Sequence, residues 1–177
     1  MIKINHKFGN YNNNFTIETL ILGTFNPDTE QNNAEFYYGR QHNFLWNLLP
    51  RVFGYKTLKN SSLSEKIEFI NNLKIGFSDL IEEIQIEEGN ETNYEDEFID
   101  KKVTKWNDLE FIISKCENLK SIYFTRKSFS GIPNIRKQIE NLKIICQEKK
   151  IDFNLLPTPA RFENEKKLND WKTIFKK

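Results

Sequence analysis

Short apolar runs alternate with longer segments of helical periodicity along this chain. Three runs rich in β-branched or aromatic residues predict buried strands at 16–23, 121–125 and 151–156, and a shorter apolar piece spans 75–81. Apolar residues spaced three and four apart predict helices over 43–53, 64–73, 106–116, 132–148 and 163–175. This alternation predicts an α/β fold with three layers, α/β/α, and a small central parallel sheet.

Residues 82–105 interrupt the alternation. They are acidic and poor in apolar side chains, so we expect them to form a surface excursion. The 177 residues otherwise fit one domain spanning 1–177, because this length can bury one substantial core. The sequence contains no apolar leader and no run of membrane-spanning length, and we expect a soluble, cytoplasmic monomer with no membrane partner.

Cysteine and histidine are scarce. Cys116 and Cys146 cannot supply a disulfide framework or a four-cysteine metal site, and His6 and His42 add too few ligands for a zinc centre. We therefore expect two buried cysteines, no metal and no redox cofactor.

The formal net charge of +1 hides an uneven distribution of charged residues. Residues 1–78 hold 8 basic and 6 acidic side chains, residues 79–119 hold 4 and 13, and residues 120–177 hold 14 and 6. A basic C-terminal third is suited to meeting a phosphate backbone. Solvated helix faces account for the same charges equally well.

Three predicted strands end in short loops, at 23–27, 125–126 and 157–161. Because the carboxyl ends of parallel strands face one edge of a sheet, we expect these loops to meet there. Two of the loops contain proline, which fixes the backbone and favours a preorganised site. Aromatic residues at 36–38 offer flat surfaces, so the pattern predicts a pocket for a planar ligand such as a nucleobase.

Several blocks of sequence together resemble the uracil-DNA glycosylase superfamily, most closely its mismatch-specific and hypoxanthine-type branches. They are Gly-Thr-Phe-Asn-Pro at 23–27, Tyr-Tyr-Gly at 37–39, Asn-Phe-Leu-Trp at 43–46, Leu-Pro-Thr-Pro-Ala-Arg at 156–161 and Lys-Leu-Asn-Asp-Trp at 167–171. The resemblance covers residues 16 to 171 and implies a uracil-DNA-glycosylase-like fold. It also implies a monofunctional DNA glycosylase, an activity typical of DNA repair, which needs no cofactor.

The resemblance implies that the partner is single- or double-stranded DNA. Such an enzyme flips a damaged, deaminated or modified base out of the stack and hydrolyses its N-glycosidic bond. Asn26 is the first candidate for positioning the attacking water, because the mismatch-specific branch has an Asn before Pro in that role. Asn43 is the competitor, since the hypoxanthine-type branch uses an Asn of the block at 43–46 for this role. Asn43 is equally suited to capping a helix. Asp28 is a third candidate, as a carboxylate base.

Five further residues are candidates for contact with the flipped base. Phe25, Tyr37 and Tyr38 can stack on it, although we expect at least one of them to pack in the core. Asp79 can accept a hydrogen bond from the base or cap the following helix. Arg126 follows the strand at 121–125, and its planar fork suits either a base edge or a phosphate.

A fourth block lies before the last helix and is a candidate for contact with DNA. Thr158, Pro159, Ala160 and Arg161 match the loop that other members of the superfamily press into the duplex. Arg161 can fill the gap left by the base, hold a phosphate, or simply be an exposed arginine on a loop.

Two functions of other classes remain open on sequence grounds. A non-catalytic nucleobase- or nucleic-acid-sensing module can share the same fold, because fold does not determine function. A hydrolase of free nucleosides is the third hypothesis.

Overall fold

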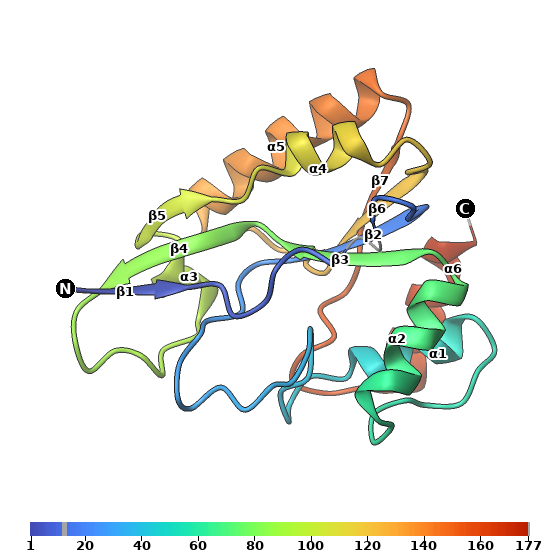
Figure 1. Cartoon of the computed structure of the whole chain (residues 1–177), viewed down its shortest axis with the longest axis horizontal. Coiled ribbons are helices and arrows are strands. Elements are labelled where there is room, and N and C mark those ends of the chain that lie inside the picture. The colour runs from blue at the N-terminus through green and yellow to red at the C-terminus, as the bar shows by residue number, and fades with distance from the viewer. Residues whose placement is uncertain (12–13, 177) are drawn as a thin grey trace.

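The computed structural model describes residues 1–11 and 14–176 (Figure 1). The strands in the described part are β1 (Ile2–Asn5), β2 (Thr19–Gly23), β3 (Ile75–Asp79), β4 (Ile81–Ile86), β5 (Val103–Trp106), β6 (Ser121–Phe124) and β7 (Asp152–Leu155). The helices are α1 (Leu45–Val52), α2 (Leu63–Asn72), α3 (Asp96–Ile99), α4 (Leu109–Lys115), α5 (Pro133–Glu148) and α6 (Glu165–Phe175).

The main sheet has the strand order β3-β2-β6-β7, and all three pairings are parallel. Successive residues of β2 point to opposite faces, so Leu20 and Leu22 join one apolar cluster and Ile21 joins the other. Helices α4 and α5 cover the first face, and α1, α2 and α6 cover the second (Figure 1). The predicted three-layer α/β/α fold with a small parallel sheet is confirmed.

A second, antiparallel sheet of order β1-β4-β5 extends from the first. Residues 82–105 supply most of β4, α3 and nearly all of β5, so the prediction of a surface excursion is wrong for much of this segment. Ile84 and Ile86 of β4 are buried in the core, whereas the acidic side chains of this strand form surface ion pairs: Glu82 with Lys105, and Glu83 with Lys3. Two of the acidic side chains of this segment are therefore solvated residues of β4, and six others lie at 87–97, in the connection to α3 and at the start of that helix.

Two helices begin later in the chain than predicted. Trp106 was expected to open a helix, but it ends β5 in register with Ile81, and α4 begins at Leu109 after the cap Asp108. Helix α1 begins at Leu45 rather than at residue 43. Gly54, at a φ of +80°, follows the helix where a stop was expected.

Cys116 and Cys146 are free and buried, as predicted. Within 1–11 and 14–176, no helix combines the length and the apolar character needed to cross a bilayer.

Asp100 joins the second sheet to helix α5. Its side chain is buried, and its Oδ1 accepts a hydrogen bond from the backbone N–H of Ile135 at 2.6 Å. Its Oδ2 accepts from the backbone and side-chain nitrogens of Asn134, at 3.2 and 3.1 Å. Asp100 thus satisfies the first free N–H groups of α5, whose own cap residue, Ile132, makes no side-chain hydrogen bond.

Replacing Asp100 by Ala is expected to lower the free energy of unfolding by about 2–3 kcal/mol, because buried N–H groups lose a charged acceptor. Denaturant unfolding measures the loss. Asp152→Ala removes an exposed carboxylate from β7 and serves as the control. An equal loss in the two variants would contradict this role for Asp100.

Candidate functional site

The carboxyl ends of β2, β3 and β6 meet around Gly23. Gly23 lies opposite Asp79 in the β2–β3 register, and Thr125 donates its backbone N–H to the carbonyl of Leu22 at 3.0 Å. A Cβ on Gly23 would lie 2.2 Å from Oδ1 of Asp79 and 2.9 Å from the hydroxyl of Tyr38. Only glycine leaves room for both groups, so the sequence expectation of converging strand ends holds here.

A buried ion pair of His6 and Asp79 lies at this edge. The Nε2–H of His6 donates to Oδ2 of Asp79 at 2.6 Å, and both side chains are less than a tenth exposed. Burial acts to lower the pKa of His6, but the hydrogen bond and charge of Asp79 and the carbonyl of Phe8 outweigh it, so the pKa is raised above 6.5. Within the described residues, Oδ1 of Asp79 has no hydrogen-bond partner and remains able to accept one.

Tyr38 is the aromatic candidate that reaches the strand ends. Its φ of +56° is unusual for a residue other than glycine, and its hydroxyl lies 3.2 Å from Oγ1 of Thr125. Burial, and then the negative charge of Asp79, raise the pKa of Tyr38 well above its ordinary value. The hydroxyl therefore stays protonated and can act as a donor.

The other two aromatic candidates pack in the core, in keeping with the expectation that at least one would. Tyr37 stacks on Phe77 with ring centroids 5.6 Å apart, and its hydroxyl donates to the carbonyl of Gly9. Phe25 is buried, and its ring lies edge-on to the His6 ring with the two ring centroids 5.9 Å apart. The rings of Phe25 and Tyr37 both pack against the ring of His6.

Asn26 is buried and firmly oriented. Its Oδ1 accepts from Nδ2 of Asn32 at 2.7 Å, and the same Nδ2 donates to the carbonyl of Pro27. The side-chain amide of Asn32 cannot be flipped without losing hydrogen bonds, because its own Oδ1 accepts from the backbone N–H of Ala34. The amide oxygen of Asn26 thus has one of its two lone pairs engaged. Asp28 is exposed, and its backbone N–H donates to the carbonyl of Asn5.

Asn43 has a local structural role, although not as the cap residue itself. Helix α1 is capped at Phe44, and Oδ1 of Asn43 accepts from the backbone N–H of Leu45 at 3.0 Å. Asn43 also forms an isolated antiparallel bridge with Ala160, and the N–H of Phe44 donates to the carbonyl of Pro159 at 2.9 Å. Two blocks more than a hundred residues apart are joined in this way.

The loop at 157–161 is tied down from helix α6. Trp171 donates its indole N–H to the carbonyl of Pro157 at 3.0 Å, and Lys167 donates to the carbonyls of Ala160 and Phe162 at 3.3 and 2.5 Å. Burial lowers the pKa of the Lys167 ammonium, which also lies 4.0 Å from the centre of the Phe162 ring. Thr158 stabilises the turn itself by accepting from the N–H of Ala160 at 3.2 Å.

The tip of this loop exposes two side chains. Arg161 adopts a φ of +74° and is exposed, and its guanidinium lies 3.8 Å from the carboxylate of Glu95. Phe162 is 57% exposed, a large apolar side chain held out from the surface. The sequence interpretation did not single out Phe162; its position next to the predicted DNA-contacting loop is the signal that was available.

Arg126 does not point freely into the site. It forms an ion pair with Asp96, and its Nε–H donates to the carbonyl of Ser128 at 2.6 Å. Burial raises the pKa of Asp96 in spite of the neighbouring Arg126. Contact of Arg126 with a ligand stays a prediction, because that ligand would have to displace a carboxylate.

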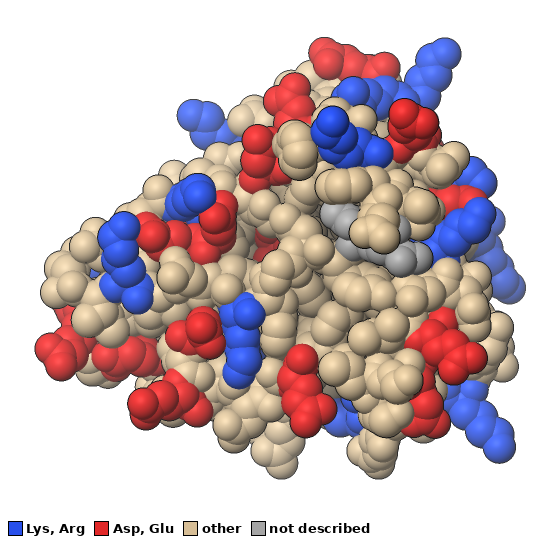
Figure 2. Space-filling view, viewed as in Figure 1, with Lys and Arg blue, Asp and Glu red and all other residues tan. Residues whose placement is uncertain are grey.

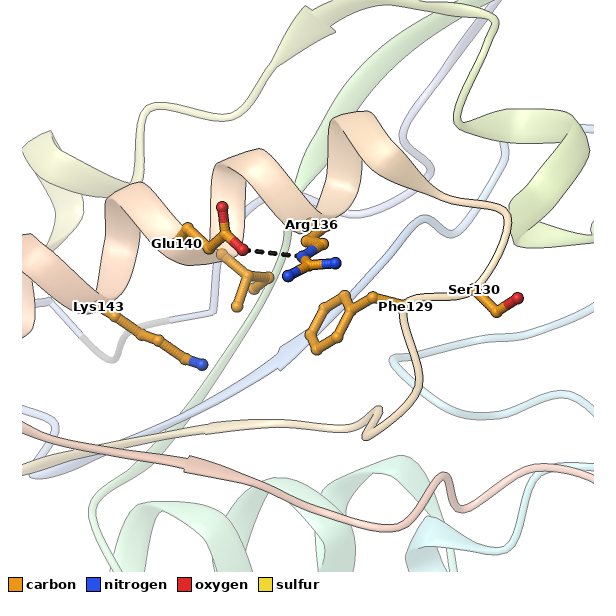
Figure 3. Close-up of a pocket in the computed structure, with 6 residues that line it drawn as sticks. Phe129, Ser130, Arg136, Glu140 and Lys143 are labelled. Atoms are coloured by element: carbon orange, nitrogen blue, oxygen red, sulfur yellow. Dashed lines mark hydrogen bonds and ion pairs between the residues drawn. The ribbon is translucent and has the colours of Figure 1, made fainter.

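A cavity lies elsewhere, along helix α5 (Figure 3). It has a volume of about 360 Å³ and is lined by Phe129 and by charged side chains of α5. Two of these, Arg136 and Glu140, pair with each other at 2.8 Å. None of the predicted site residues lines this cavity, so the geometry at the strand ends decides the candidate site.

Comparison with family models gives no match, and comparison with curated proteins gives none either. Among solved structures, the NMR structure of a Methanosarcina acetivorans protein, described as a "putative Uracil DNA glycosylase", matches with a TM-score of 0.66. The identity is 18%, over 97% of this chain and 96% of that chain. The chain has a uracil-DNA-glycosylase-like fold. In this fold the His6–Asp79 pair, Tyr38 and Asn26 lie at the carboxyl edge of the sheet.

The raised pKa of His6 predicts how stability changes with pH. The stabilisation by the pair is fully present below the unfolded pKa of about 6.5 and is lost as pH rises through the folded value. The free energy of unfolding of the native protein therefore falls over this window, and His6→Gln removes that part of the fall. Denaturant unfolding at a series of pH values measures it.

An NMR titration that measures the pKa of His6 tests the same pairing. Asp79→Asn lowers the pKa of His6, whereas Glu82→Gln, which removes a weaker and more distant charge, changes it far less. Equal shifts in the two variants would contradict the pairing.

Proposed function

We propose that the protein is a monofunctional DNA glycosylase that hydrolyses the N-glycosidic bond of a damaged, deaminated or modified base. The observation that carries the proposal is Oδ1 of Asp79, which has no hydrogen-bond partner among the described residues and lies at the carboxyl edge of the sheet near the hydroxyl of Tyr38, while His6 holds Oδ2. A uracil-DNA-glycosylase-like fold supports the same proposal by analogy.

The chemistry of Asp79 favours deaminated bases. An ionised carboxylate only accepts hydrogen bonds. Uracil and hypoxanthine carry a ring N–H on the edge where cytosine and adenine carry a bare nitrogen acceptor, and a flipped base is read on this edge. Oδ1 of Asp79 would therefore accept from the ring N–H of a deaminated base, whereas it would meet a nitrogen lone pair at the same ring position of a normal base.

The raised pKa of His6 favours its protonated form, and the positive charge of that form bears on catalysis. As the C1′–N bond breaks, its electron pair stays on the base, and the sugar becomes positively charged. Water then bonds to C1′ and releases a proton, which neutralises the base. A lone carboxylate would repel the departing base anion, and the imidazolium of His6 offsets that repulsion. The water would be positioned by the second lone pair of Asn26 or by Asn43.

The loop at 157–162 would contact the duplex. Arg161 is exposed and can meet a phosphate, and Phe162 is an apolar side chain of the kind that enters gaps between base pairs. The bonds from Lys167 and Trp171 hold the loop, which lowers the cost of ordering it on binding.

A non-catalytic nucleobase- or nucleic-acid-sensing module is the alternative. One observation favours it: the amide oxygen of Asn26 is already engaged by Asn32, which weakens the case for Asn26 as a holder of water. Both proposals use the same pocket and are separated by one experiment.

The experiment uses labelled duplexes and single strands that contain uracil, hypoxanthine or xanthine, with cytosine and adenine as controls. Alkali cleaves abasic sites, so base release is read as strand scission. We expect scission of a deaminated substrate, and Asp79→Asn lowers its rate about 100-fold, since one preorganised group of the site is lost. Asp152→Asn, on the exposed surface of β7, is the matched control.

Asn26→Ala and Asn43→Ala then identify the residue that positions the water, with the exposed Asn141→Ala on α5 as their control. Binding without scission across the whole panel would reject the glycosylase and support the sensing module. Turnover of free nucleosides without any action on DNA would support the nucleoside hydrolase instead.

A further inference from the structure

Tyr94, in the segment between β4 and α3, reaches two of the loops that form the candidate site. Its hydroxyl lies 3.0 Å from Oγ1 of Thr29, just after the Asn26–Pro27 loop. The guanidinium of Arg40, which follows the Tyr-Tyr-Gly block, lies 4.6 Å from the centre of the Tyr94 ring. This is the geometry of a cation–π contact.

The next two residues reach two further loops. Glu95 lies 3.8 Å from the guanidinium of Arg161, at the tip of the loop before α6. Asp96 forms an ion pair with Arg126, at the end of β6. Three consecutive residues therefore contact four separate segments of the candidate site, and three of these contacts are with arginines.

The segment that carries these residues is held at its ends and loosely between them. Ile86 and Ile99 are buried in the core and Phe98 packs against it, but none of residues 87–97 is fully buried. Residues 87–97 contain six acidic side chains and no basic one. Figure 2 shows acidic side chains gathered where Figure 1 places the chain between β4 and α3. Such a stretch, with few apolar contacts, opens at low cost.

Carboxylates and phosphates compete for the same arginines, because both match the planar fork of the guanidinium. We propose that Arg40, Arg126 and Arg161 form a binding surface for nucleic-acid phosphates, and that residues 94–96 occupy this surface until DNA displaces them. The proposal rests on the proposed function, in that it takes DNA as the partner. It gives the acidic segment a role that its composition alone did not explain.

The ion pair of Asp96 and Arg126 is suited to being exchanged. Burial, together with the negative charges of Asp79 and Glu95, raises the pKa of Asp96 although Arg126 lies beside it, so the surroundings of this carboxylate disfavour its ionised form. The pair of Glu95 and Arg161 is exposed on both sides and is correspondingly weak. A DNA backbone offers several phosphates at once, so it can replace both contacts together.

The test is the affinity for a fluorescently labelled duplex, measured by anisotropy over a range of salt concentrations. Neutralising the occupant with Glu95→Gln plus Asp96→Asn frees two arginines, and we expect about 10-fold tighter binding. The slope of log affinity against log salt concentration should become steeper by the amount expected for about two additional phosphate contacts. Glu88→Gln plus Glu91→Gln removes the same charge from the same segment, at two carboxylates that form no ion pair in the described structure, and is expected to change affinity far less.

A double-mutant cycle makes the test specific for one contact. Glu95→Gln alone changes an exposed side chain that is not part of the core, so the variant should fold normally. It should bind DNA more tightly. In an Arg161→Gln background the same change should have no effect, because its partner is absent. Equal tightening in both backgrounds, or equal tightening by the Glu88 and Glu91 variant, would overturn the proposal. Absence of DNA binding by every variant at low salt would overturn it as well.

Base release is measured in the same samples, which keeps the two proposals apart. Tighter binding by the Glu95 and Asp96 variant without any base release would leave the occupied surface standing and reject the glycosylase. Base release with unchanged affinities would support the glycosylase and reject the occupied surface.

Discussion

The buried ion pair of His6 and Asp79 is the interaction on which the site depends. It joins the end of β1 in the antiparallel sheet to the end of β3 in the parallel sheet, and His6 also bridges to Pro27 beside Asn26. Removing either partner would leave a charge in a place with little access to water. The pair thus fixes how the two sheets meet and leaves one carboxylate oxygen available at the strand ends.

Rigid and loosely held parts are distributed unevenly around this pair. The loops that carry Asn26 and Asn43 are held by bonds from Asn32 and Ala160, and Lys167 ties down the loop before α6. Residues 87–95 are strongly acidic, and among the described residues their contacts with other segments are surface contacts of Glu87, Tyr94 and Glu95. Preorganised groups at the centre and the proposed displaceable cover at the rim would together suit the proposed DNA partner.

Periodicity predicted much of the fold, because β2, β6, β7 and the helices place apolar residues on faces that the sheet covers. It missed the second sheet, because β1 has only four residues and β4 carries its acids on a solvated face. The motifs identified the strand-end loops and Tyr38. They did not reveal His6, which lies 73 positions from Asp79, or the pairing of Arg126 with Asp96, because such contacts depend on how distant segments pack.

The central claim is that Asp79, held by His6, reads a flipped base at the carboxyl edge of the sheet. A crystal structure with a duplex that contains 2′-fluorinated deoxyuridine or deoxyinosine tests it most directly, because the electron-withdrawing fluorine preserves the glycosidic bond. The account predicts a base N–H within hydrogen-bond distance of Oδ1 of Asp79, with His6 still on Oδ2. A base bound elsewhere, with Asp79 remote from it, would contradict the account.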